Sequence, residues 1–181
     1  MKPAPWLLLL AAMLGSGCAG KAPVDRGSPA ATSRPEAEGR RPGTLSIAIP
    51  LVGLRVEDVP VRVHLALRDR ERRRGLSGVK RLAPDEGMLF AYKVARVRTF
   101  WMKDCLVPLD IAFLDDRHRI FQIATLAAPP PNAVEEDIEE VTSDRPTALV
   151  LEMPAGFFSR YGIREGALVR IPRDVPLHLA E

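Results

Sequence analysis

The sequence predicts a mostly β, single compact barrel-like domain of short strands with one or two short helices. Three observations lead to this fold class. From Thr44 onward the apolar residues recur mostly with period two, the periodicity of half-buried strands. The apolar runs are short and separated by turn residues, and no internal repeat divides the chain. With 181 residues, 46% hydrophobic and 27% charged, the chain is long enough for one domain with a real core.

The first predicted strands are Leu45–Ile49 and Val61–Leu67, in which apolar and other residues alternate. In the second strand, Val61, Val63, Leu65 and Leu67 share one face, and Arg62, His64 and Ala66 share the other. Residues 68–76 then predict a short helix or helical turn that Gly75 ends.

Four further strands are predicted along the middle of the chain, at Gly87–Tyr92, Arg98–Lys103, Leu109–Asp115 and Arg119–Leu126. The link Asp115–His118 is short enough for a hairpin. Pro108 indicates an irregular point between the second and third of these strands. Residues 129–141 interrupt the pattern and predict a surface loop.

The last third of the chain begins with its most strand-like run, Thr147–Met153. Residues 154–163 predict a second helix, with Pro154 at its first position and Gly162 at its end. Ala167–Ile171 returns to a strand. Residues 45–181 are therefore expected to form one β-rich domain.

The N-terminal residues 1–18 have the pattern of a lipoprotein-type signal peptide. Lys2 precedes a short apolar run, Trp6–Leu14, and small residues lead to Cys18, the expected lipidation site. Gly15 stands where such signals usually have leucine, so ordinary signal cleavage with Cys18 left as a free thiol is the alternative. Residues 19–44 hold no aromatic residue and few aliphatic ones, which predicts a disordered tether. The protein is expected to be exported and lipid-anchored in a bacterial cell envelope, on the periplasmic side of a membrane or at the cell surface.

Charge is distributed unevenly along the chain. Residues 1–44 hold six Lys and Arg and three Asp and Glu, which leaves 20 of each sign in 45–181. The formal net charge of +3 therefore belongs to the N-terminal region, and a nucleic-acid partner is not expected. Within the domain, residues 68–81 hold seven basic residues and residues 135–144 hold six acidic ones. Solvated faces are the default interpretation of both runs, and contact with anionic lipid headgroups or cell-wall polymers is the alternative for the basic segment.

Six motifs in a fixed order identify a family. They are ERRRGL at 71–76, DEGMLF at 85–90, FWMKDC at 100–105, VPLDIAFLD at 107–115, VLEMPAG at 150–156 and YGIREGALV at 161–169. Together they resemble the domain-of-unknown-function 192 (DUF192) family over residues 59–172. The resemblance implies a compact, mostly β fold and no established activity. Where that family commonly has Asn-Thr after FWMK, this chain has Asp104 and Cys105.

Cys105 and the methionines are the candidate soft ligands and nucleophiles. A catalytic thiol would need a lowered pKa, for which Lys103 is the nearby cation. Because the resemblance places threonine at this position, Cys105 is interpreted as a small, half-buried residue. No metal site or cofactor is predicted, because the three histidines are widely separated. Met88, Met102 and Cys105 could form a soft copper site if strands aligned them, but strand methionines usually pack in a core.

Asp110 and Glu152 are the candidate functional carboxylates because each lies in a strongly apolar run. Each needs a base or backbone donors if it is buried, and Arg72 and Lys103 are the expected partners. A fold-fixing ion pair, a polar pocket at a barrel mouth and a hydrolytic acid pair all remain open.

Trp101 follows Phe100 directly, so in a strand only one of the two rings can enter the core. An exposed Trp101 beside Lys103 would suit stacking against a sugar ring or a partner protein. Cover by Phe157, Phe158 and Tyr161 is the structural alternative.

These features lead to three hypotheses. The first is a non-catalytic envelope lipoprotein that binds a ligand or partner, an envelope protein or polymer, through Arg72, Trp101, Lys103, Asp110 and Glu152. The second is a hydrolase-like enzyme acting on an envelope polymer with Asp110 or Glu152 as acid or base. The third is a membrane-surface or assembly factor that uses residues 68–81. The sequence does not predict an oligomeric state.

Overall fold

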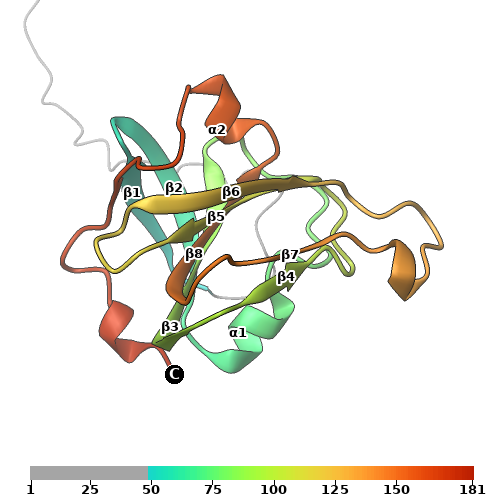
Figure 1. Ribbon diagram of the computed structural model, residues 1–181, viewed down its shortest axis with the longest axis horizontal. Helices are drawn as coiled ribbons and strands as arrows, with labels where there is room; N and C mark the ends of the chain where they lie inside the picture. Colours follow the sequence, from blue (N-terminus) through green and yellow to red (C-terminus); the bar gives the residue numbers. More distant parts are fainter. Residues whose placement is uncertain (1–48) are drawn as a thin grey trace, which may run out of the picture. The chain divides into compact units, whose positions relative to one another are not determined.

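The computed structural model describes residues 49–181. This part of the chain holds nine strands, two short α-helices and two 3-10 helices (Figure 1). In chain order they are β1 (Leu51–Val56), β2 (Val59–Ala66), α1 (Asp69–Arg74), β3 (Glu86–Arg96), β4 (Thr99–Trp101), β5 (Leu109–Leu114), β6 (Ile120–Leu126), η1 (Glu135–Asp137), β7 (Glu140–Thr142), β8 (Thr147–Pro154), α2 (Phe157–Arg160), β9 (Val169–Arg170) and η2 (Leu177–Leu179).

The N-terminal predictions fall outside this range. The signal peptide at 1–18, its Cys18 and the tether at 19–44 lie outside the described residues, as does the strand predicted at Leu45–Ile49 except for its last residue. None of the helices within residues 49–181 is long and apolar enough to cross a bilayer.

Seven strands form one curled sheet in the order β6-β5-β8-β3-β2-β1-β9. All neighbouring pairs are antiparallel except β2 and β3, which are parallel. The two edges of the sheet approach each other through an isolated bridge between Arg119 and Leu168. Next to it, the Ile120 N–H donates to the Ala167 carbonyl at 2.9 Å. The sheet is therefore a curled half-barrel, which confirms the mostly β, barrel-like class.

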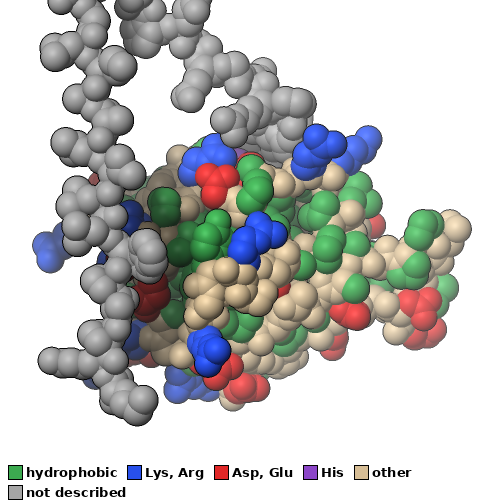
Figure 2. All heavy atoms as spheres, turned by 90° about the horizontal axis from the view of Figure 1, so that it is seen from above, with side chains coloured by type: hydrophobic (Ala, Val, Ile, Leu, Met, Phe, Trp, Pro, Cys, Tyr) green, Lys and Arg blue, Asp and Glu red, His purple; other side chains and the backbone are tan. Residues whose placement is uncertain are grey.

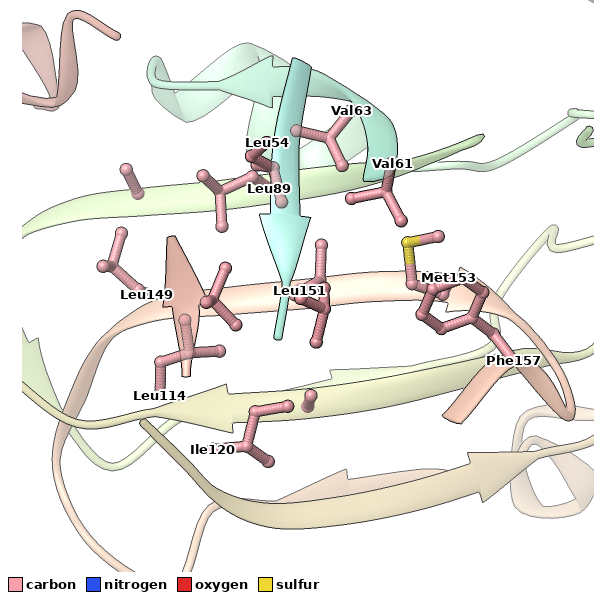
Figure 3. Packing of buried hydrophobic residues seen from close by; sticks show 14 of the residues in the cluster. Leu54, Val61, Val63, Leu89, Leu114, Ile120, Leu149, Leu151, Met153 and Phe157 are labelled. Atoms are coloured by element: carbon pink, nitrogen blue, oxygen red, sulfur yellow. The ribbon is translucent and has the colours of Figure 1, made fainter. Parts of the chain in front are cut away.

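Alternation along the strands creates two buried clusters, one on each face of the sheet. In β8, Leu149, Leu151 and Met153 belong to the inner cluster, and Val150 belongs to the outer one. Figure 3 shows inner-cluster side chains from β1, β2, β3, β5 and β8 converging on a shared interior. The inner face is thus a filled core, and any site must lie on the outer face or at an end of the barrel.

A second, two-stranded sheet of β4 and β7 is tied to the outer face of the large one. Phe100 of β4 provides the attachment. Its ring packs edge-on against Phe90 of β3 at 5.0 Å and Phe113 of β5 at 5.9 Å, measured between centroids. This aromatic cluster fixes which side of β4 is buried.

The α1 helix forms at the predicted place. The Glu71 carboxylate accepts the backbone N–H groups of Leu67 and Arg68, both at 2.9 Å, which satisfies donors at the start of the helix. Gly75 ends the helix with φ of 50°, a left-handed conformation that favours glycine. Three arginines in the last turn complement the helix dipole.

The predicted start of the second helix is wrong. Pro154 is the last residue of β8, where it still pairs with Leu109 of β5. The chain turns only at Gly156, with φ of 81°, and α2 begins at Phe157. Gly162, with φ of 64°, follows the helix as expected. The strand extends further than predicted because β5 supplies paired residues from Leu149 to Pro154.

Two strands were missed by the sequence prediction. β1 buries only two of its six residues, Leu54 and Val56, so its own pattern is weak, and it forms because β2 pairs with it in a hairpin. β7 overlaps the run predicted as a surface loop and is only three residues long. It exists because β4 offers it a pairing edge.

The predicted β5–β6 hairpin is confirmed. Asp115 Oδ1 accepts the N–H groups of Arg117 at 2.9 Å and Arg119 at 2.7 Å, and His118 takes a φ of 60°. Asp115 therefore stabilises the turn.

Candidate functional site

Trp101 is the prominent exposed aromatic residue of the β4–β7 sheet. Its side chain keeps 47% of its surface accessible, whereas neighbouring Phe100 is buried. The Lys103 ammonium nitrogen lies 4.9 Å from the centroid of the indole ring, in the range of a cation–π contact. Phe157 and Phe158 pack in the inner cluster and do not cover Trp101, so the indole faces solvent.

Charged groups surround this ring. Lys103 and Asp104 follow it and are exposed, and Glu140 is its cross-strand partner in β7. Lys103 makes no ion pair within residues 49–181. The neighbouring segment, which includes η1, projects from the sheet, and Figure 2 shows acidic side chains on this projection. The indole therefore lies at an exposed edge where a basic and an acidic group meet.

Asp110 lies on the inner side of β5 and is 2% exposed. Its carboxylate accepts the Thr125 hydroxyl at 2.6 Å and the backbone N–H of Phe158 at 3.2 Å. It therefore joins β5, β6 and the start of α2. The sequence analysis expected a base or backbone donors for this carboxylate, and the structure supplies a backbone donor. Asp110 therefore has a structural role.

Glu152 lies on the opposite face of the sheet and is only 6% exposed. Its Oε2 is buried without a hydrogen-bond partner in the described part of the chain. Burial raises the pKa of Glu152 from 4.5 to about 8, because the charged form loses its hydration. The carboxyl is therefore mostly protonated at neutral pH.

The two carboxylates do not form a hydrolytic pair. Asp110 pairs in register with Met153, an inner-cluster residue, whereas Glu152 pairs with Ile111, an outer-cluster residue. The sheet itself separates the two side chains. An acid and a base acting on one bond must share a face, which this arrangement does not provide.

Arg72 has structural partners and not the partner that the sequence predicted. Its guanidinium is buried and donates to the carbonyls of Leu67, Ala91 (2.9 Å) and Glu181 (3.0 Å), and it pairs with Asp69. It thus joins α1 to β2, β3 and the C-terminus. The expected pairing of Arg72 with a strand carboxylate is not formed.

Cys105 is buried and free. Burial, followed by the carboxylates of Glu152 and Asp104, raises its pKa to about 12. A thiol in this state is not a nucleophile at neutral pH. The interpretation as a small buried residue therefore fits better than a catalytic one.

His64 is a buried polar residue that sequence reasoning did not single out. It is 2% exposed, its Nε2 lies 3.0 Å from Glu86 Oε1, and its Nδ1 has no partner in residues 49–181. The signal was weak because His64 stands in an alternating strand like any solvent-facing residue. Its burial follows from the parallel pairing of β2 with β3, which the sequence does not reveal.

Two open grooves lie elsewhere. One, of about 630 Å³, is lined by the β5–β6 turn and by Arg145, Pro146 and Thr147 before and within β8. The other, of about 500 Å³, lies along β1 and β2 and is rimmed by Arg55, Arg62, Asp85 and Arg170. Neither groove includes Glu152 or Trp101. No cluster of three or more His, Cys, Asp or Glu side chains able to hold a metal occurs between residues 49 and 181.

Comparisons with known proteins agree with this fold. The model of the DUF192 family, described as uncharacterised, matches residues 52–171. A crystal structure from Sinorhizobium meliloti 1021, provisionally described as a transcription regulator, is 32% identical, with a TM-score of 0.57 over 71% of this chain and 97% of that chain. A protein of unknown function from Novosphingobium aromaticivorans DSM 12444 is 28% identical, with a TM-score of 0.56 over 77% and 99%. No curated protein matches the chain.

Proposed function

Since this chain belongs to the DUF192 family, we propose that it is a non-catalytic, lipid-anchored envelope protein that binds an envelope glycan through Trp101. The observation that carries the proposal is the 47% exposure of Trp101 on a sheet whose other aromatic residue, Phe100, is buried. An aromatic ring with an open face suits stacking against the apolar face of a sugar ring.

A glycan fits this surface better than a protein partner does. Aromatic hot spots in protein interfaces lie in apolar pockets that lose their water on binding. Trp101 instead adjoins Lys103, Asp104 and Glu140, whose charged groups are exposed. Such groups can hydrogen-bond to sugar hydroxyls while remaining partly hydrated.

The attachment of β4 supports a rigid binding surface. Phe100 packs against Phe90 and Phe113, and the Met102 N–H donates to the Glu139 carbonyl at 3.0 Å. Trp101 is thus held between two residues that are fixed to the domain. A rigid ring loses little conformational entropy when it stacks on a ligand.

Co-sedimentation with purified peptidoglycan sacculi tests the proposal. The full chain is expected to pellet with sacculi, and Trp101→Ala is expected to reduce the bound fraction at least fivefold. Tyr161→Ala is a matched control, because Tyr161 is also 47% exposed but follows α2. Equal retention of both variants would refute binding through Trp101.

The enzyme alternative has less support. Glu152 has the raised pKa of a general acid, but it is buried, and its expected partner Asp110 faces the other side of the sheet.

The membrane-surface alternative rests on residues 68–81, where Asp69 and Glu71 already pair with Arg68, Arg72 and Arg73. The Sinorhizobium protein is provisionally described as a transcription regulator, which would imply a nucleic-acid partner. We do not extend this to the present chain, because residues 45–181 carry equal numbers of basic and acidic residues.

Export and lipidation at Cys18 are part of the proposal, and the sequence of residues 1–18 supports them. A Cys18→Ser variant is expected to move the protein from the membrane fraction to the soluble fraction. Unchanged membrane association would contradict the lipid anchor.

A further inference from the structure

Three residues form a row across the outer face of the sheet. His64 of β2 is paired in register with Met88 of β3, and Met88 is paired with Glu152 of β8. Met88 belongs to the outer cluster, so its two neighbours in the row share that face. Adjacent strands are about 4.8 Å apart, which places the imidazole and the carboxyl on either side of the Met88 thioether.

The two outer members of this row hold unpartnered polar atoms. In residues 49–181, His64 Nδ1 and Glu152 Oε2 are the buried side-chain nitrogen and oxygen atoms without a hydrogen bond. An unsatisfied buried polar group is destabilising, so native proteins keep few of them. These two atoms, on either side of one methionine, are therefore candidate donors to a ligand.

Glu86 holds the imidazole of His64 through one ring nitrogen. The Glu86 carboxylate lies 3.0 Å from His64 Nε2 and accepts the Ala83 N–H at 3.4 Å through its other oxygen. A carboxylate oxygen accepts the hydrogen bond that Nε2–H donates, so Nδ1 is the ring nitrogen with a free lone pair. Metal-binding histidines commonly hold their second ring N–H in this way, on a carboxylate.

Further sulfur atoms lie in the same cluster. Met102 and Cys105 are buried there with Met88, and a turn joins them, since the Cys105 N–H donates to the Met102 carbonyl at 3.0 Å. This turn lies on the same side of the sheet as the row, because both of its sulfur residues belong to the outer cluster with Met88. Lys103 and Asp104, between the two sulfur residues, are exposed.

We propose that His64 Nδ1, Met88 Sδ and Glu152 form a buried site for one copper(I) ion, with Met102 as a further sulfur ligand. Thioether sulfur with imidazole nitrogen is a donor set that favours copper(I) among biological metals. One carboxylate is too few for calcium or magnesium. The scarcity of further His, Cys, Asp or Glu ligands in the described residues disfavours a structural zinc site.

Competition with the chelator bicinchoninate under anaerobic conditions tests the site. The full chain is used with Cys18→Ser, so that Cys105 is its one cysteine. This protein is expected to bind one copper(I) ion, and Met88→Leu is expected to weaken binding at least tenfold. Met153→Leu is the matched control, because Met153 is equally buried but lies in the inner cluster. Both changes nearly conserve volume, so both variants are expected to fold.

Two further measurements separate a ligand role from a structural one. Glu86→Gln is expected to lower copper(I) affinity about 10- to 100-fold, as is usual for a residue that orients a ligand. In the protein with unchanged methionines, silver(I) is expected to shift the methyl NMR signal of Met88 and not that of Met153. Absence of copper(I) binding, equal affinity of the two methionine variants, or tighter binding of zinc(II) would overturn the proposal.

Discussion

Replacing Glu152 by glutamine is expected to remove a pH-dependent loss of stability from the metal-free protein. The folded state raises the pKa of this carboxyl from 4.5 to about 8, so folding favours its protonated form. The stability is therefore complete below pH 4.5 and is lost progressively as the pH rises through about 8. Each pKa unit is worth about 1.4 kcal/mol, so the upper limit of this loss is about 5 kcal/mol.

At pH 7 the loss already amounts to about 3 kcal/mol, a large share of the roughly 5–15 kcal/mol that stabilises most domains. Glutamine has nearly the same shape as the protonated carboxyl and cannot ionise. The free energies of unfolding of the two proteins are therefore expected to be similar at pH 5, with the variant increasingly more stable at pH 7 and pH 9.

Urea unfolding with a chelator present, at pH 5, 7 and 9, measures this difference. Cys105, with a pKa of about 12, and Tyr92, whose pKa is raised above 10, keep their protons over this range. A difference that stays constant from pH 5 to pH 9 would refute the burial of Glu152 without a partner.

Three further changes test other parts of the structure. Iodoacetamide is expected to alkylate Cys105 far more slowly than a free thiol at pH 8, because the thiol is buried and protonated; mass spectrometry follows the reaction, and fast labelling would revive a nucleophilic role. Gly87→Ala is expected to destabilise the fold by at least about 1–3 kcal/mol, because its Cβ would overlap the Glu152 carbonyl oxygen; thermal unfolding measures this, and an unchanged midpoint would contradict the close approach of β3 and β8. Reversing the exposed Arg70, Arg73 and Arg74 to glutamate is expected to leave binding to anionic vesicles at low salt unchanged, and weaker binding would favour the membrane-surface hypothesis.

The sequence was sufficient to predict the fold class because apolar residues recur with period two in the long strands. In β2, Val61, Val63 and Leu65 face the inner cluster and Ala66 the outer one, and in β8 Leu149 and Leu151 face the inner cluster and Val150 the outer one. The glycines of the family motifs were also informative, since Gly75 and Gly162 take positive φ where the helices end. These features depend on local geometry, which neighbouring residues determine.

What the sequence could not show depends on pairing between distant segments. β7 is three residues long and needs β4, some forty residues earlier, as a partner. In the same way, His64 is buried because β3 and its Glu86 lie beside it. The separation of Asp110 and Glu152 onto opposite faces required the register of β5 with β8, which no local pattern reports.

The candidate site was therefore predicted only in part. The exposure of Trp101 beside Lys103 follows from simple alternation with the core residue Phe100. The partners assigned to Arg72 were wrong, because the guanidinium donates to the carbonyls of Ala91 in β3 and of Glu181 instead. A long flexible side chain can reach many acceptors, so its partner is not fixed by its position in the sequence.

The fluorescence of Trp101 tests the central claim most directly. In a Trp6→Phe background Trp101 is the one remaining tryptophan of the chain, so its emission reports this site alone. Soluble disaccharide-peptide fragments of peptidoglycan are expected to shift its emission to shorter wavelength in a saturable manner. Unchanged emission at fragment concentrations that compete the protein off sacculi would show that the glycan binds elsewhere and would contradict the account.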